Sequence, residues 1–243
     1  MRFACVLFAG AFATIAAIGS AHAVCTNATL LGSYGSVQFQ GTEYAIHLFH
    51  YAADGKGNVS GSETRSVGGT IETKTFTGTY SVSRNCTGSF TLKYSNSTGT
   101  NSFVIDHGGK GLEIMETDSG YNTGGSALIQ GTVPCGLTGK SQIVAVNLTG
   151  LSSGNNVTSV GQLKLSGTGT LSGTVTFSLA GAISTYSVSG NYSVNTDCTG
   201  RAQLKGLPSN SPANFALVEV SDGQEFLMLE TDTNTMVQGA MTQ

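Results

Sequence analysis

The chain has 243 residues, of which 39% are hydrophobic, 10% are charged and 34 are glycine. Its low charge, with 11 Phe and 8 Tyr, excludes a disordered chain, which is more highly charged and poorer in aromatic residues. The formal net charge of −3 provides no basic surface for DNA or RNA, so we expect no nucleic-acid partner.

Residues 1–23 are typical of a secretory signal peptide. Arg2 precedes an apolar stretch from Ala4 to Ile18, and the sequence Ala21-His22-Ala23 provides a small-residue cleavage site. The apolar stretch is too short to cross a bilayer comfortably, and we expect no membrane span elsewhere. The sequence therefore predicts a secreted or periplasmic protein that begins after Ala23.

Beyond the signal peptide, short alternating apolar runs are interrupted by Gly, Asn, Asp and Ser, which predicts an all-β fold. A small closed antiparallel up-and-down β-barrel of about eight strands leaves no exposed sheet edge. A β-sandwich with the same number of strands is the alternative. The strands expected in the first half are Tyr34 to Gln40, Tyr44 to Ala52, Gly57 to Arg65, Thr70 to Val82, Gly88 to Tyr94, Ser102 to Asp106, Gly111 to Thr117 and Ser126 to Gln130.

The second half repeats the first, which predicts two tandem barrels, one at 24–131 and one at 132–243. Two further segments match: Asp54 to Gly61 with Ser166 to Gly173, and Leu112 to Asp118 with Phe226 to Asp232. A match this long between the halves indicates one domain type built twice. The clearest match pairs Gly78, Tyr80, Val82, Cys86 and Gly88 with Gly190, Tyr192, Val194, Cys198 and Gly200.

The mature chain keeps four cysteines, Cys25, Cys86, Cys135 and Cys198. Four cysteines allow three pairings, but their matching places in the two halves predict disulfides Cys25–Cys86 and Cys135–Cys198. No cysteine has a second Cys or His at ligand spacing, so we expect no metal and no cofactor. A lipid anchor on Cys25 is disfavoured, because Val24 stands where a lipoprotein carries a small residue.

The histidines of the first half raise the question of a metal pair. Thr42 to Ala53 could form a helix with His47 and His50 on one face, but its counterpart, Asn156 to Leu165, alternates as a strand does. Side chains three positions apart in a strand point to opposite faces. We therefore expect a strand here, and a metal site on these two histidines is improbable.

Positions that stay apolar in both halves predict the two cores. They pair Tyr80 with Tyr192, Val82 with Val194, Leu92 with Leu204, Phe103 with Phe215, Ile105 with Leu217, Leu112 with Phe226, and Ile114 with Met228. Period-two alternation then places Glu116 and Glu230 on the inward face as well.

The two inward glutamates have two interpretations. In the functional one, Glu116 or Glu230 is an acid, a base or a ligand anchor at a barrel mouth, with Tyr80 or Tyr192 supplying a hydroxyl. In the structural one, which we favour, each carboxylate accepts hydrogen bonds from backbone amides or a Tyr hydroxyl, and the aspartate two positions later starts a turn.

The run Gly-x-Tyr-x-Val-x-x-x-Cys-Thr-Gly, with its Glu-Thr-Asp strand ending, resembles a group of little-characterised secreted bacterial proteins. Those proteins carry a Tyr-x-Val-Asn-x-Asp-Cys-Thr-Gly phrase, which is nearly complete at Tyr192 to Gly200, whereas the first copy departs from it at Ser83, Arg84 and Asn85. The resemblance implies a domain type and no activity. The meander is more loosely similar to calycin and allene-oxide-cyclase-like barrels, which bind apolar small molecules.

These observations favour a secreted, non-catalytic protein of two disulfide-closed barrels that binds a small, largely apolar ligand. An inward apolar set with one polar anchor is the usual composition of a ligand pocket. Two alternatives remain: an envelope or matrix protein that acts through its polar exterior, and a cofactor-free isomerase or cyclase that uses an inward Glu. The candidate ligand-binding residues are Glu116, Glu230, Tyr80 and Tyr192.

Overall fold

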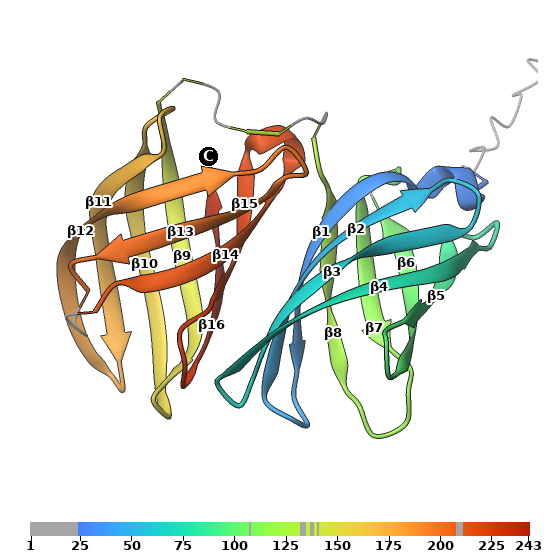
Figure 1. Cartoon of the computed structure of the whole chain (residues 1–243), viewed down its shortest axis with the longest axis horizontal. Coiled ribbons are helices and arrows are strands. Elements are labelled where there is room, and N and C mark those ends of the chain that lie inside the picture. The colour runs from blue at the N-terminus through green and yellow to red at the C-terminus, as the bar shows by residue number, and fades with distance from the viewer. Residues whose placement is uncertain (1–23, 107, 132–134, 137–138, 140, 208–210) are drawn as a thin grey trace, which may run out of the picture.

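The computed structural model describes residues 24–106, 108–131, 135–136, 139, 141–207 and 211–243. These residues form sixteen strands and two short 3-10 helices, and the strands close into two barrels that lie side by side (Figure 1). Every strand pairs with its neighbours in antiparallel register. The predicted fold, two tandem antiparallel eight-stranded barrels, is confirmed, and the sandwich alternative is wrong.

The first barrel is an up-and-down meander that closes where β1 pairs with β8, with Tyr34 opposite Ile129. A 3-10 helix, η1, precedes it at Asn27–Leu30. Its strands are β1 (Leu31–Gln40), β2 (Ala45–Asp54), β3 (Asn58–Val67), β4 (Thr70–Val82), β5 (Thr87–Lys93), β6 (Thr98–Asp106), β7 (Gly111–Glu116) and β8 (Thr123–Ile129).

The second barrel repeats this order and closes where β16 pairs with β9. A second 3-10 helix, η2, lies at Ser221–Gly223. Its strands are β9 (Gln142–Ser152), β10 (Asn155–Leu165), β11 (Thr170–Leu179), β12 (Ala182–Val194), β13 (Thr199–Lys205), β14 (Ala213–Val220), β15 (Glu225–Glu230) and β16 (Thr235–Thr242).

The strand predictions for the first half agree in order and differ at the ends. The largest difference is β6, which begins at Thr98 and not at Ser102. The inward positions of this extension are Gly99 and Asn101, so it lacks the apolar alternation by which a strand is recognised in a sequence.

The repeated glycines of the Gly-x-Tyr-x-Val-x-x-x-Cys-Thr-Gly run stand where two strands approach too closely for a side chain. A Cβ on Gly78 would overlap the carbonyl oxygen of Thr91, and one on the matching Gly190 would overlap that of Gln203. Gly88 has no room either, because the ring of Phe103 covers it. Glycine recurs in this run because the adjacent strand or a packed ring leaves no room for a Cβ atom at these positions.

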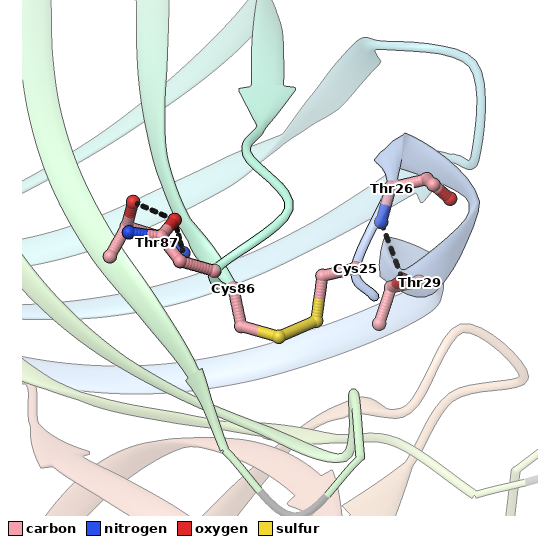
Figure 2. Close-up of a disulfide and its surroundings, with 6 residues drawn as sticks. Cys25, Thr26, Thr29, Cys86 and Thr87 are labelled. Carbon is pink, nitrogen blue, oxygen red and sulfur yellow. Dashed lines mark hydrogen bonds between the residues drawn. A yellow bond between two sulfur atoms is a disulfide. The ribbon is translucent and has the colours of Figure 1, made fainter. Parts of the chain in front are cut away.

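Each barrel carries its predicted disulfide, Cys25–Cys86 in the first and Cys135–Cys198 in the second. Figure 2 shows that the first joins the segment before η1 to the turn between β4 and β5. In both copies the second cysteine has a positive φ, 66° at Cys86 and 68° at Cys198. The disulfides therefore hold equivalent tight turns in the two copies.

The predicted inward residues lie in the two cores, but the match between the copies needs one correction. Gly88 lies opposite Phe103 in the first barrel, and its counterpart Gly200 lies opposite Leu217. Phe103 therefore corresponds to Leu217 and not to Phe215, which corresponds to Asn101. By the same shift Ile105 corresponds to Glu219, so its predicted match with Leu217 is wrong as well. The two extra residues of the second copy enter before β14, in a connection whose polar composition gives no alignment signal.

The two barrels pack through an apolar cluster between the outer faces of β1–β3 and β14–β16. Two hydrogen bonds join the barrels beside it, from Ser66 Oγ to the Thr235 carbonyl at 2.6 Å and from the Asn234 amide to the Gly69 carbonyl at 2.9 Å. The buried members of the cluster are Ile46, Leu48, Val218, Val220 and Leu229.

Replacing Leu48 with aspartate is expected to separate the barrels without unfolding them. Leu48 is 3% exposed within the apolar cluster, so a carboxylate there costs about 2 kcal/mol or more. Small-angle scattering should show a larger radius of gyration while the circular dichroism spectrum stays unchanged. Val160→Asp, at an outer position that is 63% exposed, should change neither quantity. An unchanged radius for Leu48→Asp would contradict the prediction.

Candidate functional site

The first barrel contains a cavity of about 160 Å³, which reaches the end of the barrel remote from η1. Its apolar wall includes four aromatic rings, those of Phe49, Tyr51, Phe76 and Phe90. The polar residues that line it come from seven of the eight strands and from the β5–β6 and β7–β8 turns, and they include Gln38, Gln40, His47, Glu63, Arg65, Lys74, Tyr94, Asn101, Glu116, Asp118 and Thr123.

A buried hydrogen-bonded pair, His47 and Glu63, lies in this cavity. His47 Nδ1 lies 2.5 Å from Glu63 Oε1, and the two side chains are 7% and 3% exposed. Burial opposes ionisation of Glu63, but hydrogen bonds from His47 and Tyr94 outweigh it and hold the pKa of this carboxyl below its usual value. Because Glu63 is ionised at neutral pH, His47 Nδ1 is the donor in this bond.

Gln40 extends the pair on its other side. His47 Nε2 lies 3.1 Å from Gln40 Oε1, so both nitrogens of the ring face oxygen acceptors. Glu63 and Gln40, one at each ring nitrogen, therefore fix the orientation of the His47 ring.

Two cations and a carboxylate form the rim of the cavity. Glu72 accepts hydrogen bonds from Arg65 at 2.8 and 3.0 Å, and Lys74 Nζ lies 3.1 Å from the same carboxylate oxygen. These contacts lower the pKa of Glu72. Arg65 and Lys74 are therefore already paired with an anion of the chain.

Two buried polar atoms of the cavity have no hydrogen-bond partner among the described residues. They are Gln40 Nε2 and the hydroxyl oxygen of Tyr51, which belong to residues that are 2% and 5% exposed. Leaving such atoms unpaired costs free energy, so a native structure that keeps them requires an explanation.

The second barrel has no ionisable side chain at the positions that match His47, Glu63 and Arg65. The strand registers place Ser159 where the first barrel has His47, and Val175 where it has Glu63. Phe177 replaces Arg65 in the same way. Because the fold forms without the charged pair in its second copy, the pair is not needed to build a barrel of this type.

Glu116 and Glu230 both lie on the inward face, as predicted. Glu116 lines the cavity and accepts a hydrogen bond from Thr123 Oγ1. Burial, reinforced by the charge of Asp232, raises the pKa of Glu230 to about 7. Whether either glutamate binds a ligand stays a prediction.

The aspartates that follow these glutamates have a structural role. Asp118 accepts hydrogen bonds from the amide and the hydroxyl of Thr100, and Asp232 accepts them from the amide and the side chain of Asn214. Each aspartate therefore ties the end of its strand to the preceding strand.

The hydroxyls of the two predicted tyrosines make contacts away from the glutamates. Tyr80 donates to the carbonyl oxygens of Asn27 and Leu30, at 3.0 and 3.1 Å, at the η1 end of the first barrel. Tyr192 donates to the carbonyl of Ser166 at 2.6 Å. The structure does not bring Tyr80 to the cavity that Glu116 lines, and a ligand-binding role for either tyrosine stays a prediction.

The prediction that the two histidines lie on a strand and not on a helix is confirmed. His47 and His50 lie on opposite faces of β2. His47 points into the barrel, whereas His50 lies outside it, close to Gln130 and to Asp197 of the second barrel. Burial lowers the pKa of His50. Within the described ranges, no cluster of three or more His, Cys, Asp and Glu side chains is arranged to hold a metal ion.

Sequence reasoning missed His47, Glu63 and Gln40 as site residues. Their signal is the same internal comparison that identified the core. At inward-facing positions, the first copy has His47 and Glu63 where the second has Ser159 and Val175, and an ionisable side chain in one copy only at a buried position marks a difference in use.

Comparison with known proteins assigns the chain to no family. No protein-family model matches the chain, and no curated protein is significantly similar to it in sequence. The resemblance to secreted bacterial proteins based on the Tyr192 to Gly200 phrase therefore stays a prediction. None of the helices that the structure describes is long and apolar enough to cross a membrane.

Glu230→Gln is expected to stabilise the protein at pH 8 and to leave its stability unchanged at pH 4. The pKa of Glu230 is about 7 in the folded chain against an ordinary 4.5, so stability falls as the pH rises between these values. Removing the charge should recover about 2 kcal/mol above pH 7, allowing for partial exposure. Urea unfolding at both pH values tests this, with exposed Glu113→Gln as the control. An equal effect at both pH values would refute it.

Proposed function

We propose that the protein binds a small ligand in the cavity of the first barrel, while the second barrel is a filled structural companion. The observation that carries this proposal is the cavity itself, which is lined by the buried His47–Glu63 pair and by two polar atoms without a hydrogen-bond partner among the described residues. An apolar wall with a few convergent polar groups is the usual composition of a small-molecule site.

The energetics of the two copies support the proposal. Burying a charged pair rarely stabilises a protein more than apolar residues of similar volume would. The second barrel holds Val175 at the position of Glu63, so the fold accepts the apolar solution. A costly arrangement kept in one copy, and next to a cavity, is what binding chemistry would require.

The compartment belongs to the same proposal. Two disulfides are typical of a protein from an oxidising environment. Residues 1–23 carry the features of a signal peptide but lie outside the described residues. We therefore place the binding protein in the periplasm or outside the cell.

Blocking the cavity mouth is expected to abolish ligand binding while the protein stays folded. Gly99 lines the cavity, and a Cβ added there would meet only Asp118 Oδ2, at 3.8 Å, so Gly99→Phe can enter the mouth with little strain. Ligand-observed NMR with single-ring aromatic fragments should detect binding to the unmodified protein and at least about tenfold weaker binding to the variant.

Ser102→Phe is the matched control for this experiment. Ser102 lies on the same strand but is exposed on the outer face, so a phenylalanine there does not enter the cavity. The control should bind fragments as the unmodified protein does. Equal binding by Gly99→Phe, or no binding by the unmodified protein, would overturn the proposal. The second result would favour a structural role in the envelope or matrix.

A further inference from the structure

The cavity has the size of a single ring. Its volume is about 160 Å³, and a protein cavity of about 150 Å³ accepts benzene. The rings around it make edge and tilted contacts with one another: Phe49 and Phe76 are 6.2 Å apart, Phe76 and Tyr94 5.6 Å, and Tyr51 and Phe90 5.8 Å. A wall of this kind favours a planar aromatic guest.

The unpartnered atoms of the wall specify the polar groups of the guest. Gln40 Nε2 can only donate hydrogen bonds, and its amide oxygen already faces His47. Burial raises the pKa of Tyr51 well above its usual value, so its hydroxyl stays neutral and can donate. Gln40 Nε2 therefore requires an acceptor atom on the ligand, and the Tyr51 hydroxyl can donate to the same kind of atom.

The charges of the cavity disfavour an ionic guest. The carboxylate of Glu63 is ionised and buried, and Glu116 and Asp118 also line the cavity. The cations of the lining, Arg65 and Lys74, already contact the carboxylate of Glu72, so an anionic guest would compete with Glu72 for them. A cation would leave the two donors without acceptors.

From these observations we infer that the ligand is a neutral single-ring aromatic compound with hydrogen-bond acceptor oxygens, and that Gln40 Nε2 and the Tyr51 hydroxyl receive them. The inference rests on the proposed function and adds the ligand's chemical class. Tyr51 and Gln40 are then specificity residues, and their unpaired polar atoms are the cost of a site that is complete only with its ligand.

The test compares four probes of similar size by protein-observed NMR titration of the full mature chain. Acetophenone is neutral and has an acceptor, ethylbenzene has none, benzoate is an anion and benzylammonium is a cation. Acetophenone should bind about fivefold or more tighter than each of the others. Tighter binding of ethylbenzene or of either ion would overturn the inference while leaving the proposed function standing. If none of the four binds, both fail.

Tyr51→Phe separates a binding role from a structural one. Removing an unpartnered buried hydroxyl should raise the melting temperature of the free protein, because no hydrogen bond is lost. The same change should weaken acetophenone binding by about 3- to 10-fold, the value of one hydrogen bond, and leave ethylbenzene within about twofold. Gln40→Leu should also weaken acetophenone selectively.

Tyr34→Phe is the control for Tyr51→Phe. The Tyr34 ring stacks on Tyr51 at 5.5 Å, but its hydroxyl donates to the Gly109 carbonyl at 2.8 Å and the residue does not line the cavity. This variant should lower the melting temperature and leave acetophenone binding unchanged. If acetophenone binds equally well to Tyr51→Phe, Gln40→Leu and the unmodified protein, the assignment of the two donors is wrong.

Discussion

Replacing Cys25 and Cys86 together with alanine is expected to destabilise the first barrel by about 4 kcal/mol. The disulfide closes a loop with a sequence separation of 61 residues, and in the chain-entropy model a crosslink of that length restricts the unfolded chain by about this amount. Urea unfolding, followed by hydrogen exchange of the β4 and β5 amides, measures the loss.

The backbone at Cys86 allows a sharper form of this prediction. Its φ of 66° lies in the left-handed region, where a side chain is strained and glycine is not. The pair Cys25→Ala with Cys86→Gly should therefore be about 1 kcal/mol more stable than the pair with alanine at both positions. Equal stability of the two pairs would show that the turn relaxes once the crosslink is gone.

The second barrel provides the control for both measurements. Its own disulfide, Cys135–Cys198, has a separation of 63 and a matching φ of 68° at Cys198. Exchange of the β12 and β13 amides should stay unchanged in the Cys25 and Cys86 variants. Loss of protection in both barrels would mean that they unfold as one unit.

Breaking the buried pair is expected to cost more than removing it. His47→Leu or Glu63→Leu alone should destabilise the first barrel by about 3 kcal/mol, because the first leaves the buried Glu63 carboxylate without its partner and the second leaves a buried polar ring nitrogen without one. The double variant should lose less than either single variant, since apolar residues of similar volume replace the whole pair. Val175 in the second barrel shows that the fold accepts an apolar residue at the position of Glu63.

A double-mutant cycle in urea unfolding measures the coupling between His47 and Glu63. The expected interaction energy is about 2 kcal/mol or more, favouring the intact pair over the singly substituted forms. The pair also predicts acid sensitivity. The pKa of Glu63 is lowered in the folded chain, so its contribution to stability is present above the ordinary pKa of glutamate and is lost as the pH falls through the folded value.

If the two single losses simply add in the double variant, the charges act independently and the interpretation of a coupled pair is wrong. Ser159→Leu in the second barrel is the matched control, because it alters the position equivalent to His47 without touching a charge. Its hydroxyl is buried without a partner among the described residues, so this change should not destabilise the second barrel through a lost hydrogen bond.

Much of the fold follows from local and repeated features of the sequence. Period-two alternation gives the inward face of each strand, and the repeat identifies equivalent positions such as Tyr80 and Tyr192. The equal placement of cysteines in the two halves is enough to select the disulfide pairing that the structure contains. These properties depend only on neighbours along the chain or on comparison of the two copies.

The site could be predicted only in part. The alternation placed Glu116 inward, and the same rule applied to β2 and β3 also places His47 and Glu63 inward. Whether two inward side chains meet, however, depends on the register between strands and on their depth in the barrel. That register brings His47 Nδ1 to 2.5 Å from Glu63 Oε1, although the residues are 16 positions apart in the sequence.

The sequence by itself determined the strand order, the duplication, the disulfide pairing and which residues of each strand point into the barrel, because each depends on spacing along one chain. Only the tertiary structure decided which barrel is hollow and how the barrels pack. A cavity is what remains after side chains from eight closed strands have filled the interior, so its place depends on all of their volumes together. The difference between Phe215 and Asn101 at equivalent positions takes effect only when the barrel closes.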